Sequence, residues 1–336
     1  MTLPVLICDD SRLARRQMAR SLPENWDVEI TFAENGQEAI DMIRQGKGDL
    51  LFLDLNMPVM NGYEVLEIIR QEDLPTLVLV VSGDIQTEAR RRVMSKGALD
   101  FIKKPVTADQ IQELLERYGI YDAAANEDAH AHIVDGDALQ SPDFKEAFRE
   151  VINVAMGQAG SHLSDLLDTF IGLPVPDVLE CAYKTLPRHL SYADGTGMSA
   201  VSHGFSGNGI AGEGVLLMRT DQMSELRTLV ASDLPAKADT DAGILTDLSE
   251  LLVGACLKGI SQQLDLDFNH SYPAVLGHNL QCAELLDSEH NEQDVLAVTI
   301  TYQMMHPVLE CHLLLLLTSD SIPALTSRVQ LISASD

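Results

Sequence analysis

The stretch that decides the fold of the first part of the chain is LLFLDLNMP, residues 50–58. Four apolar residues run without interruption into Asp54, and a Met-Pro pair follows shortly after. A continuous apolar run of this kind is typical of a parallel strand that is covered on both faces. The stretch therefore predicts a buried strand that ends in a carboxylate.

Similar β-rich runs lie on both sides of this stretch, and segments with helical spacing separate them. The runs are Leu3–Cys8, Val28–Ala33, Leu50–Asp54, Leu77–Ser82 and Leu99–Lys103. Five strands that alternate with helices predict an α/β fold with a doubly wound, five-stranded parallel sheet over residues 1–120. In such sheets, ligands bind at the carboxyl ends of the strands, where the strand order reverses.

Polar residues stand where these strands are expected to end, so they should gather at one edge of the sheet. They are Asp9, Asp10, Asp54, Ser82 and Lys104. Carboxylates are ligands that Mg²⁺ prefers, and an Asp carboxylate can act as the nucleophile that takes a phosphoryl group. A lysine, a hydroxyl group and a metal ion supply the positioning and charge neutralisation that phosphoryl transfer needs.

The chain resembles the CheY-like receiver domains of response regulators over residues 3–118. The resemblance rests on CDDS (8–11), LDLNMP (53–58), MNG (60–62), VSG (81–83) and KKP (103–105). It implies phosphorylation of Asp54 by a histidine kinase. It also implies that Asp9, Asp10 and Asp54 hold Mg²⁺ with the main chain of Asn56. Ser82 and Lys104 would contact the phosphoryl group, and Phe101 would be the switch aromatic, although a plain core role for Phe101 stays open.

Charge and cysteine content narrow the class of protein. The net charge is −28: residues 1–120 carry 14 basic and 20 acidic side chains, and residues 121–336 carry 9 and 31. Direct nucleic-acid binding is not expected, because it needs clustered Lys and Arg. The five cysteines are scattered, as expected for reduced thiols in the cytoplasm. No secretion signal is visible, and the apolar run Leu313–Leu317 is too short for membrane insertion.

The second part of the chain contains a weak internal repeat. Residues 121–140 are polar, small or acidic and predict a linker. Beyond it, the helical pattern of Phe144–Leu167 recurs in Ile244–Leu264, and the strand-then-helix pattern from Gly214 recurs from Leu313, about 100 residues later in each case. The repeat predicts a pseudo-symmetric α+β domain over residues 141–336.

The helix predicted from Phe144 carries Glu150-x-x-Asn153 on a stripe opposite its apolar face, where we expect both side chains to be exposed. With Pro176 twenty-three residues after the Asn, this motif resembles the CheC/CheX/FliY family of phosphatases that act on phosphorylated CheY. The resemblance implies that Glu150 pairs with a lysine of the receiver. It also implies that the Asn153 amide orients a water molecule for attack on the aspartyl phosphate.

Two departures from that family leave two functions open. Glu146 replaces the Asp or Ser expected four residues before Glu150, and Val253 replaces the Asn of the second helix, after Glu250. One hypothesis is a response regulator, phosphorylated on Asp54, that dephosphorylates a CheY-like receiver through a single Glu-x-x-Asn site. The alternative is a non-enzymatic response regulator whose second domain is a phosphorylation-controlled binding module.

The second long helix also predicts a contact surface. Val253 and Leu257 stand where the first repeat has Asn153 and Gly157, a side that the repeat predicts to be exposed. Two exposed apolar side chains favour self-association, or a contact with the receiver of the same chain.

Overall fold

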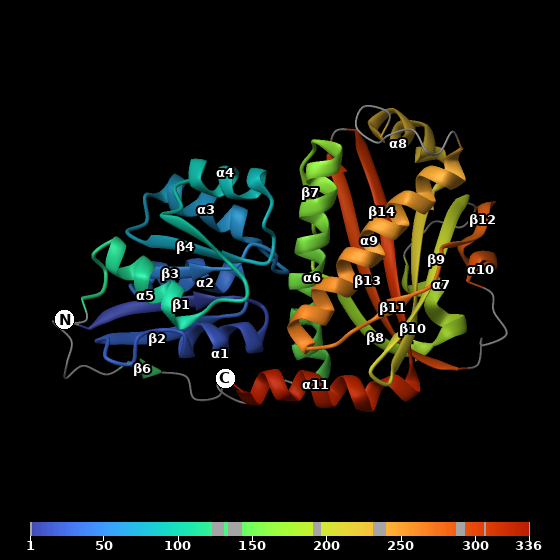
Figure 1. Ribbon diagram of the computed structural model, residues 1–336. Helices are drawn as coiled ribbons and strands as arrows, with labels where there is room; N and C mark the ends of the chain where they lie inside the picture. Colours follow the sequence, from blue (N-terminus) through green and yellow to red (C-terminus); the bar gives the residue numbers. More distant parts are fainter. Residues whose placement is uncertain are drawn as a thin grey trace. The chain divides into compact units, whose positions relative to one another are not determined.

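The computed structural model describes residues 2–122, 131–133, 143–190, 196–230, 240–286, 293–305 and 307–335. The chain splits into two compact units (Figure 1). The first contains Met1–Glu150 and Ser333–Asp336, and the second contains Val151–Ile332. The boundary falls inside helix α6 (Phe144–Leu167), so the first unit includes roughly the first two turns of that helix.

The first unit contains the predicted doubly wound parallel sheet, which is therefore confirmed. Its strands follow the order β5-β4-β3-β1-β2-β6, and every neighbouring pair is parallel. The strands are β1 (Leu3–Cys8), β2 (Val28–Ala33), β3 (Leu50–Leu53), β4 (Leu77–Ser82), β5 (Asp100–Lys103) and β6 (His132–Ile133). The short strand β6 lies inside the segment predicted as a linker, most of which is outside the described residues.

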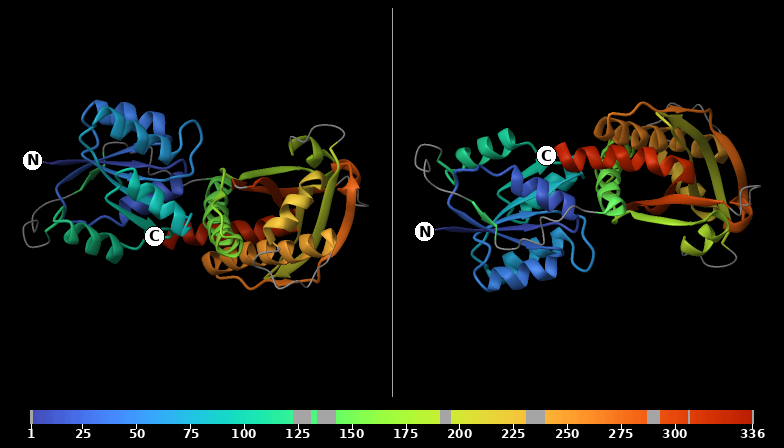
Figure 2. Two further views of the ribbon diagram at one scale, coloured as in Figure 1. Left: turned by 90° about the horizontal axis from the view of Figure 1, so that it is seen from above. Right: turned by 90° about the horizontal axis from the view of Figure 1, so that it is seen from below.

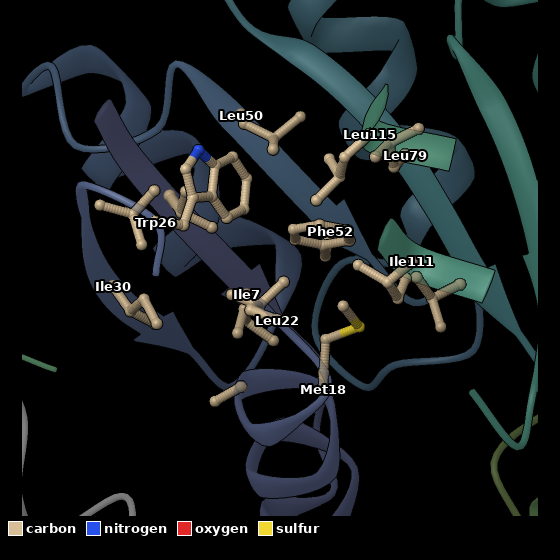
Figure 3. Packing of buried hydrophobic residues seen from close by; sticks show 14 of the residues in the cluster. Ile7, Met18, Leu22, Trp26, Ile30, Leu50, Phe52, Leu79, Ile111 and Leu115 are labelled. Carbon is tan, nitrogen blue, oxygen red and sulfur yellow. The ribbon is translucent and has the colours of Figure 1, made fainter. Parts of the chain in front are cut away.

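Helices cover both faces of this sheet, as two views from other directions also show (Figure 2). They are α1 (Arg12–Arg20), α2 (Gly36–Arg44), α3 (Gly62–Glu72), α4 (Thr87–Ser95) and α5 (Ala108–Arg117). One core, beneath α1 and α5, encloses Trp26 and Phe52 (Figure 3). The other core lies beneath α2, α3 and α4. Burial on both faces explains why the strands read as unbroken apolar runs.

The second unit is an antiparallel sheet with two long helices. Strands follow the order β11-β9-β10-β14-β13-β7, β12 pairs with β9, and β8 pairs with β13. The strands are β7 (Ile171–Gly172), β8 (Asp177–Ala182), β9 (Met198–Gly207), β10 (Ile210–Arg219), β11 (Asn269–His270), β12 (Ala274–Leu280), β13 (Asp294–Met305) and β14 (Val308–Thr318). The helices are α6, α7 (Leu186–His189), α8 (Met223–Val230), α9 (Asp241–Leu264), α10 (Cys282–Leu285) and α11 (Ile322–Ser335).

The order of these elements confirms the pseudo-symmetric α+β fold. Each half supplies a 24-residue helix, α6 or α9, then an edge strand, a short helix and a long hairpin. The two hairpins, β9–β10 and β13–β14, meet where β10 pairs with β14 in the middle of the sheet. Among the described residues, no helix is both long and apolar enough to cross a membrane.

Close packing fixes helix α9 on its sheet. A Cβ atom added at Gly259 would lie 2.8 Å from the Cα of Ala155 on α6, so the two long helices approach closely there. At Gly214 on β10, an added Cβ would lie 3.0 Å from Cγ1 of Val253. The missing side chain of Gly214 therefore leaves the space that Val253 fills.

The predicted contact surface on the second long helix is wrong. Val253 is 0 % exposed and Leu257 is 3 % exposed, so both belong to the core. The prediction assumed that only one face of α9 is buried. Because Gly214 has no side chain, Val253, which lies beside that face, also packs against the sheet. The apolar residues that replace Asn153 and Gly157 in the second repeat thus have a packing role.

Val253→Asn is expected to lower the free energy of unfolding by about 2–4 kcal/mol, because it removes a buried apolar side chain and buries an amide without a partner. Lys258→Ala, on the same helix but exposed, is the control and should change it by less than about 0.5 kcal/mol. Urea denaturation of the full chain measures both. Equal midpoints for the two variants would contradict the packing role of Val253.

Candidate functional site

Four predicted site residues lie at the carboxyl ends of four neighbouring strands. Asp9 follows β1, Asp54 follows β3, Ser82 ends β4 and Lys104 follows β5. Their exposed fractions are 5 %, 2 %, 0 % and 4 %, respectively. Polar groups this deeply buried must find partners within the protein, and most of those partners are one another.

Local backbone contacts hold Asp54 in place. Its backbone N–H donates to the carbonyl of Cys8 over 2.9 Å, and its side-chain Oδ2 accepts from the backbone N–H of Asn56 over 2.7 Å. Gly62, the first residue of α3, lies against the same strand end: an added Cβ would be 2.3 Å from the carbonyl oxygen of Asp54. Only glycine fits at that position, which explains why Gly62 follows Met60 and Asn61.

Lys104 is the centre of the cluster and contacts three carboxylates. Its Nζ donates to Oδ2 of Asp9 over 2.6 Å, and it lies 3.1 Å from Oδ1 of Asp54 and 3.0 Å from Oε1 of Glu150. Burial by itself would lower the pKa of Lys104, but the charges of Asp54, Asp9 and Glu150 raise it well above its usual value. An ammonium group has three N–H donors, so three contacts use its full capacity.

The carboxylates at this edge fit Mg²⁺ in their chemistry. Burial, with the charges of Asp9 and Asp54, raises the pKa of Asp10 to about 8, because neighbouring carboxylates disfavour one another's charged form. Oδ1 of Asp54 is buried and its one recorded contact among the described residues is the ion pair with Lys104. No set of three or more His, Cys, Asp or Glu side chains in the described ranges forms a ready-made metal site. The carboxylates of Asp9, Asp10 and Asp54, with the Asn56 carbonyl and water, supply the oxygen ligands that Mg²⁺ prefers.

Sequence reasoning missed two residues beside Ser82. Oγ of Ser82 accepts from the backbone N–H of Asp84, whose own carboxylate accepts from the backbone and side chain of Gln86. Burial raises the pKa of Asp84 to about 6. The feature of the sequence that could have pointed to Asp84 is its position two residues after the end of β4. Phe101 is half-buried and packs against the core beneath α2, α3 and α4, a placement compatible with either predicted role.

The first two turns of α6 also bring acidic side chains to this edge within the first unit. Oε1 of Glu146 accepts from the backbone N–H of Arg12 over 2.9 Å. Arg12 is the first residue of α1, whose N-terminus favours negative charge. Four residues later, Glu150 contacts Lys104, and burial raises the pKa of Glu150 to about 7, although Lys104 opposes this shift. Glu146, which departs from the family pattern, thus has a specific partner.

Glu150 and Asn153 do not lie on an exposed stripe, so that expectation is wrong. Their exposed fractions are 7 % and 6 %. The neighbouring side chains Ile152, Val154 and Met156 are also buried, so more than one face of this part of α6 is covered. Oδ1 of Asn153 has no hydrogen-bond partner in the described part of the chain. In the second repeat, Glu250 is exposed and Val253 is core, so only α6 has a Glu-x-x-Asn pair of this kind.

Residues 5–116 match the family model described as the response regulator receiver domain. The chemotaxis protein CheY of Listeria monocytogenes is 37% identical over 116 residues, which are 34% of this chain and 97% of that protein. An uncharacterized response regulatory protein of Shewanella oneidensis is 34% identical over 113 residues, 33% of this chain and 47% of that protein. The chain thus spans about half the length of this relative. Among solved structures, FliY of Thermotoga maritima matches with a TM-score of 0.43 and 20% identity, over 57% of this chain and 98% of that chain.

Proposed function

We propose that this chain, which belongs to the response regulator receiver family through residues 5–116, both accepts and removes phosphoryl groups. In the proposal, a histidine kinase phosphorylates Asp54, and the Glu-x-x-Asn site of α6 hydrolyses the aspartyl phosphate of a CheY-like receiver domain. The first activity uses the cluster at the strand ends, and the second uses Glu150 and Asn153.

The cluster has the groups that an acceptor site needs. Asp54 has one oxygen held by the Asn56 N–H and one that contacts the Lys104 ammonium, and its carboxylate can attack phosphorus. Lys104 and the hydroxyl group of Ser82 would contact the oxygens of the transferred group. Mg²⁺, bound to Asp9, Asp10 and Asp54, would neutralise charge on them.

The observation that carries the phosphatase proposal is the contact of Glu150 with Lys104, one helical turn before Asn153. An acid on α6 thus reaches the lysine next to an acceptor carboxylate. The Asn153 amide, with an oxygen that has no partner, can hold a water molecule by donating and accepting hydrogen bonds. The water oxygen forms a bond to phosphorus and the bond from phosphorus to the aspartyl oxygen breaks, which leaves the carboxylate and dihydrogen phosphate.

One observation favours the alternative of a non-enzymatic binding module. In α9, the buried residue Val253 occupies the position that Asn153 has in α6. The second repeat therefore has no Glu-x-x-Asn site. The two functions differ in one measurable property, because only a phosphatase releases inorganic phosphate from a phosphorylated partner.

The test uses the Asp54→Ala chain, which cannot hold phosphate itself, and a phosphorylated CheY-like receiver. We expect this chain to accelerate phosphate release, and we expect Glu150→Ala in the same background to slow that release at least tenfold, because a charged contact typically contributes about 1.5–3 kcal/mol. Glu250→Ala, the exposed equivalent on α9, is the matched control and should leave the rate unchanged. No release above the spontaneous rate would favour the binding module.

A further inference from the structure

We propose that strand β12 (Ala274–Leu280), with the tyrosine shortly before it, forms a surface through which two copies of this chain associate. The surface consists of Tyr272, Val275, Leu276 and Leu280, and we call it the β12 surface. It lies wholly within the second unit, and it does not depend on the proposed phosphatase function. Its partner is the same surface of a second copy, related to the first by a twofold axis.

The first observation is that apolar side chains gather on the β12 surface. Twelve large apolar side chains are exposed among the described residues, and four of them lie between residues 272 and 280. Tyr272 is 95 % exposed and Val275 is 53 % exposed, while Leu276 and Leu280 are each 38 % exposed. Single exposed apolar residues are normal on a protein surface, whereas a group of them in one place marks a site of contact.

The second observation is that β12 is an edge strand, so its backbone is also available for pairing (Figure 1). It pairs with β9, and no other described strand pairs with it. An edge strand presents N–H and C=O groups that readily take up another strand. The register of β12 against β9 shifts on both sides of Gly277. Because such bulges shorten the regular ladder, the apolar side chains contribute most of the proposed contact.

The distribution of charge identifies the partner as a second copy. Residues 195–212 and 268–283 contain no Asp, Glu, Lys or Arg, and they are the two longest such stretches of the chain. They include β9, β11 and β12, and both β11 and β12 pair with β9 at this edge of the sheet. The net charge of the chain is −28, so two copies repel each other over most of their surface. At the β12 surface they meet without bringing like charges together, whereas a basic partner would find no acidic group there.

The opposite edge of the sheet explains why the association stops at two copies. Strand β8 flanks β13 at that edge as β12 flanks β9 at this one. Asp177 and Glu180 are exposed on β8, and exposed charges are a common protection of an edge strand against pairing. Because β12 has no such protection, the contact joins two identical surfaces and forms a closed dimer, not a filament.

The test is sedimentation equilibrium of the full chain over a hundredfold range of micromolar concentrations. We expect a monomer–dimer equilibrium that tightens as the salt concentration rises, because salt screens the repulsion between two acidic copies. Leu276→Lys should weaken the dimer at least tenfold, since it brings two ammonium groups together in an apolar contact. Val308→Lys is the matched control: Val308 is 81 % exposed on β14 of the same sheet, and the substitution changes the net charge equally. It should leave the dimer unchanged.

Tyr272→Ala tests the β12 surface without a new charge. Its side chain is almost fully exposed, so its removal leaves the fold intact, and the urea midpoint of the monomer should not change. We expect the dissociation constant of the dimer to rise roughly tenfold, because aromatic side chains contribute strongly to protein contacts.

Three results would overturn the proposal. The first is a wild-type chain that stays monomeric over the whole concentration range. The second is a dimer of Leu276→Lys and of Tyr272→Ala that is as tight as the dimer of Val308→Lys. The third is a wild-type dimer that dissociates as the salt concentration rises, because ion pairs would then hold it together.

Discussion

Asp54→Ala is expected to abolish phosphorylation of the chain completely. Asp54 follows β3, which lies between β1 and β4 in the sheet, so its carboxylate stands among Asp9, Ser82 and Lys104. An aspartate carboxylate placed among a lysine, a hydroxyl group and a second carboxylate is the group we expect to attack phosphorus. Intact mass after treatment with a small phosphodonor and Mg²⁺ measures the phosphorylated fraction.

The matched control for this experiment is Asp49→Ala, an exposed aspartate before the same strand. It should be phosphorylated to the same extent as the wild-type chain. Labelling of the Asp54→Ala chain at the control level would place the acceptor elsewhere.

The second large effect is expected for Asn153→Ala, which should slow phosphate release from a phosphorylated CheY-like receiver by about 10²–10³-fold, or about 2.7–4 kcal/mol in the barrier. The reason is that a methyl group cannot hold a water molecule in line with the phosphorus. Asn153 has no hydrogen-bond partner at Oδ1 among the described residues, so its removal breaks no recorded bond of that oxygen.

Stability and binding serve as controls for the same variant. Asn153→Ala should stay folded, with a free energy of unfolding within about 1–2 kcal/mol of the wild-type value because the side chain is buried. It should bind the phosphorylated receiver with unchanged affinity. Slower release with unchanged binding assigns the loss to the chemical step. Full activity of Asn153→Ala would mean that another group orients the water.

Much of the first unit could be predicted from the sequence, because its strands are short apolar runs that end in polar residues. Asp9, Asp54 and Lys104 follow their strands directly, so the parallel topology is enough to bring them together. The two-residue strand β6 could not be predicted, because two residues in a polar segment carry no periodic pattern.

The contacts of α6 and α9 were harder to predict, since they depend on partners that are distant in the sequence. Glu146 and Arg12 are 134 residues apart, and a side chain that accepts from a backbone N–H leaves no charge pattern to recognise. The burial of Val253 depends on Gly214, on a different element, which has no side chain. In both cases the spacing of residues along one helix predicts which side chains share a face. What that face contacts depends on the shape of the neighbouring element.

The pairing of β10 with β14 in the middle of the second sheet has a consequence for protein engineering. Each half of the repeat completes the sheet of the other, with seven paired positions from Gly212 opposite Leu317 to Met218 opposite Cys311. A half expressed alone would present a long apolar strand with unpaired N–H and C=O groups, which readily adds another strand. The two halves, produced as separate polypeptides, should therefore reassemble with each other.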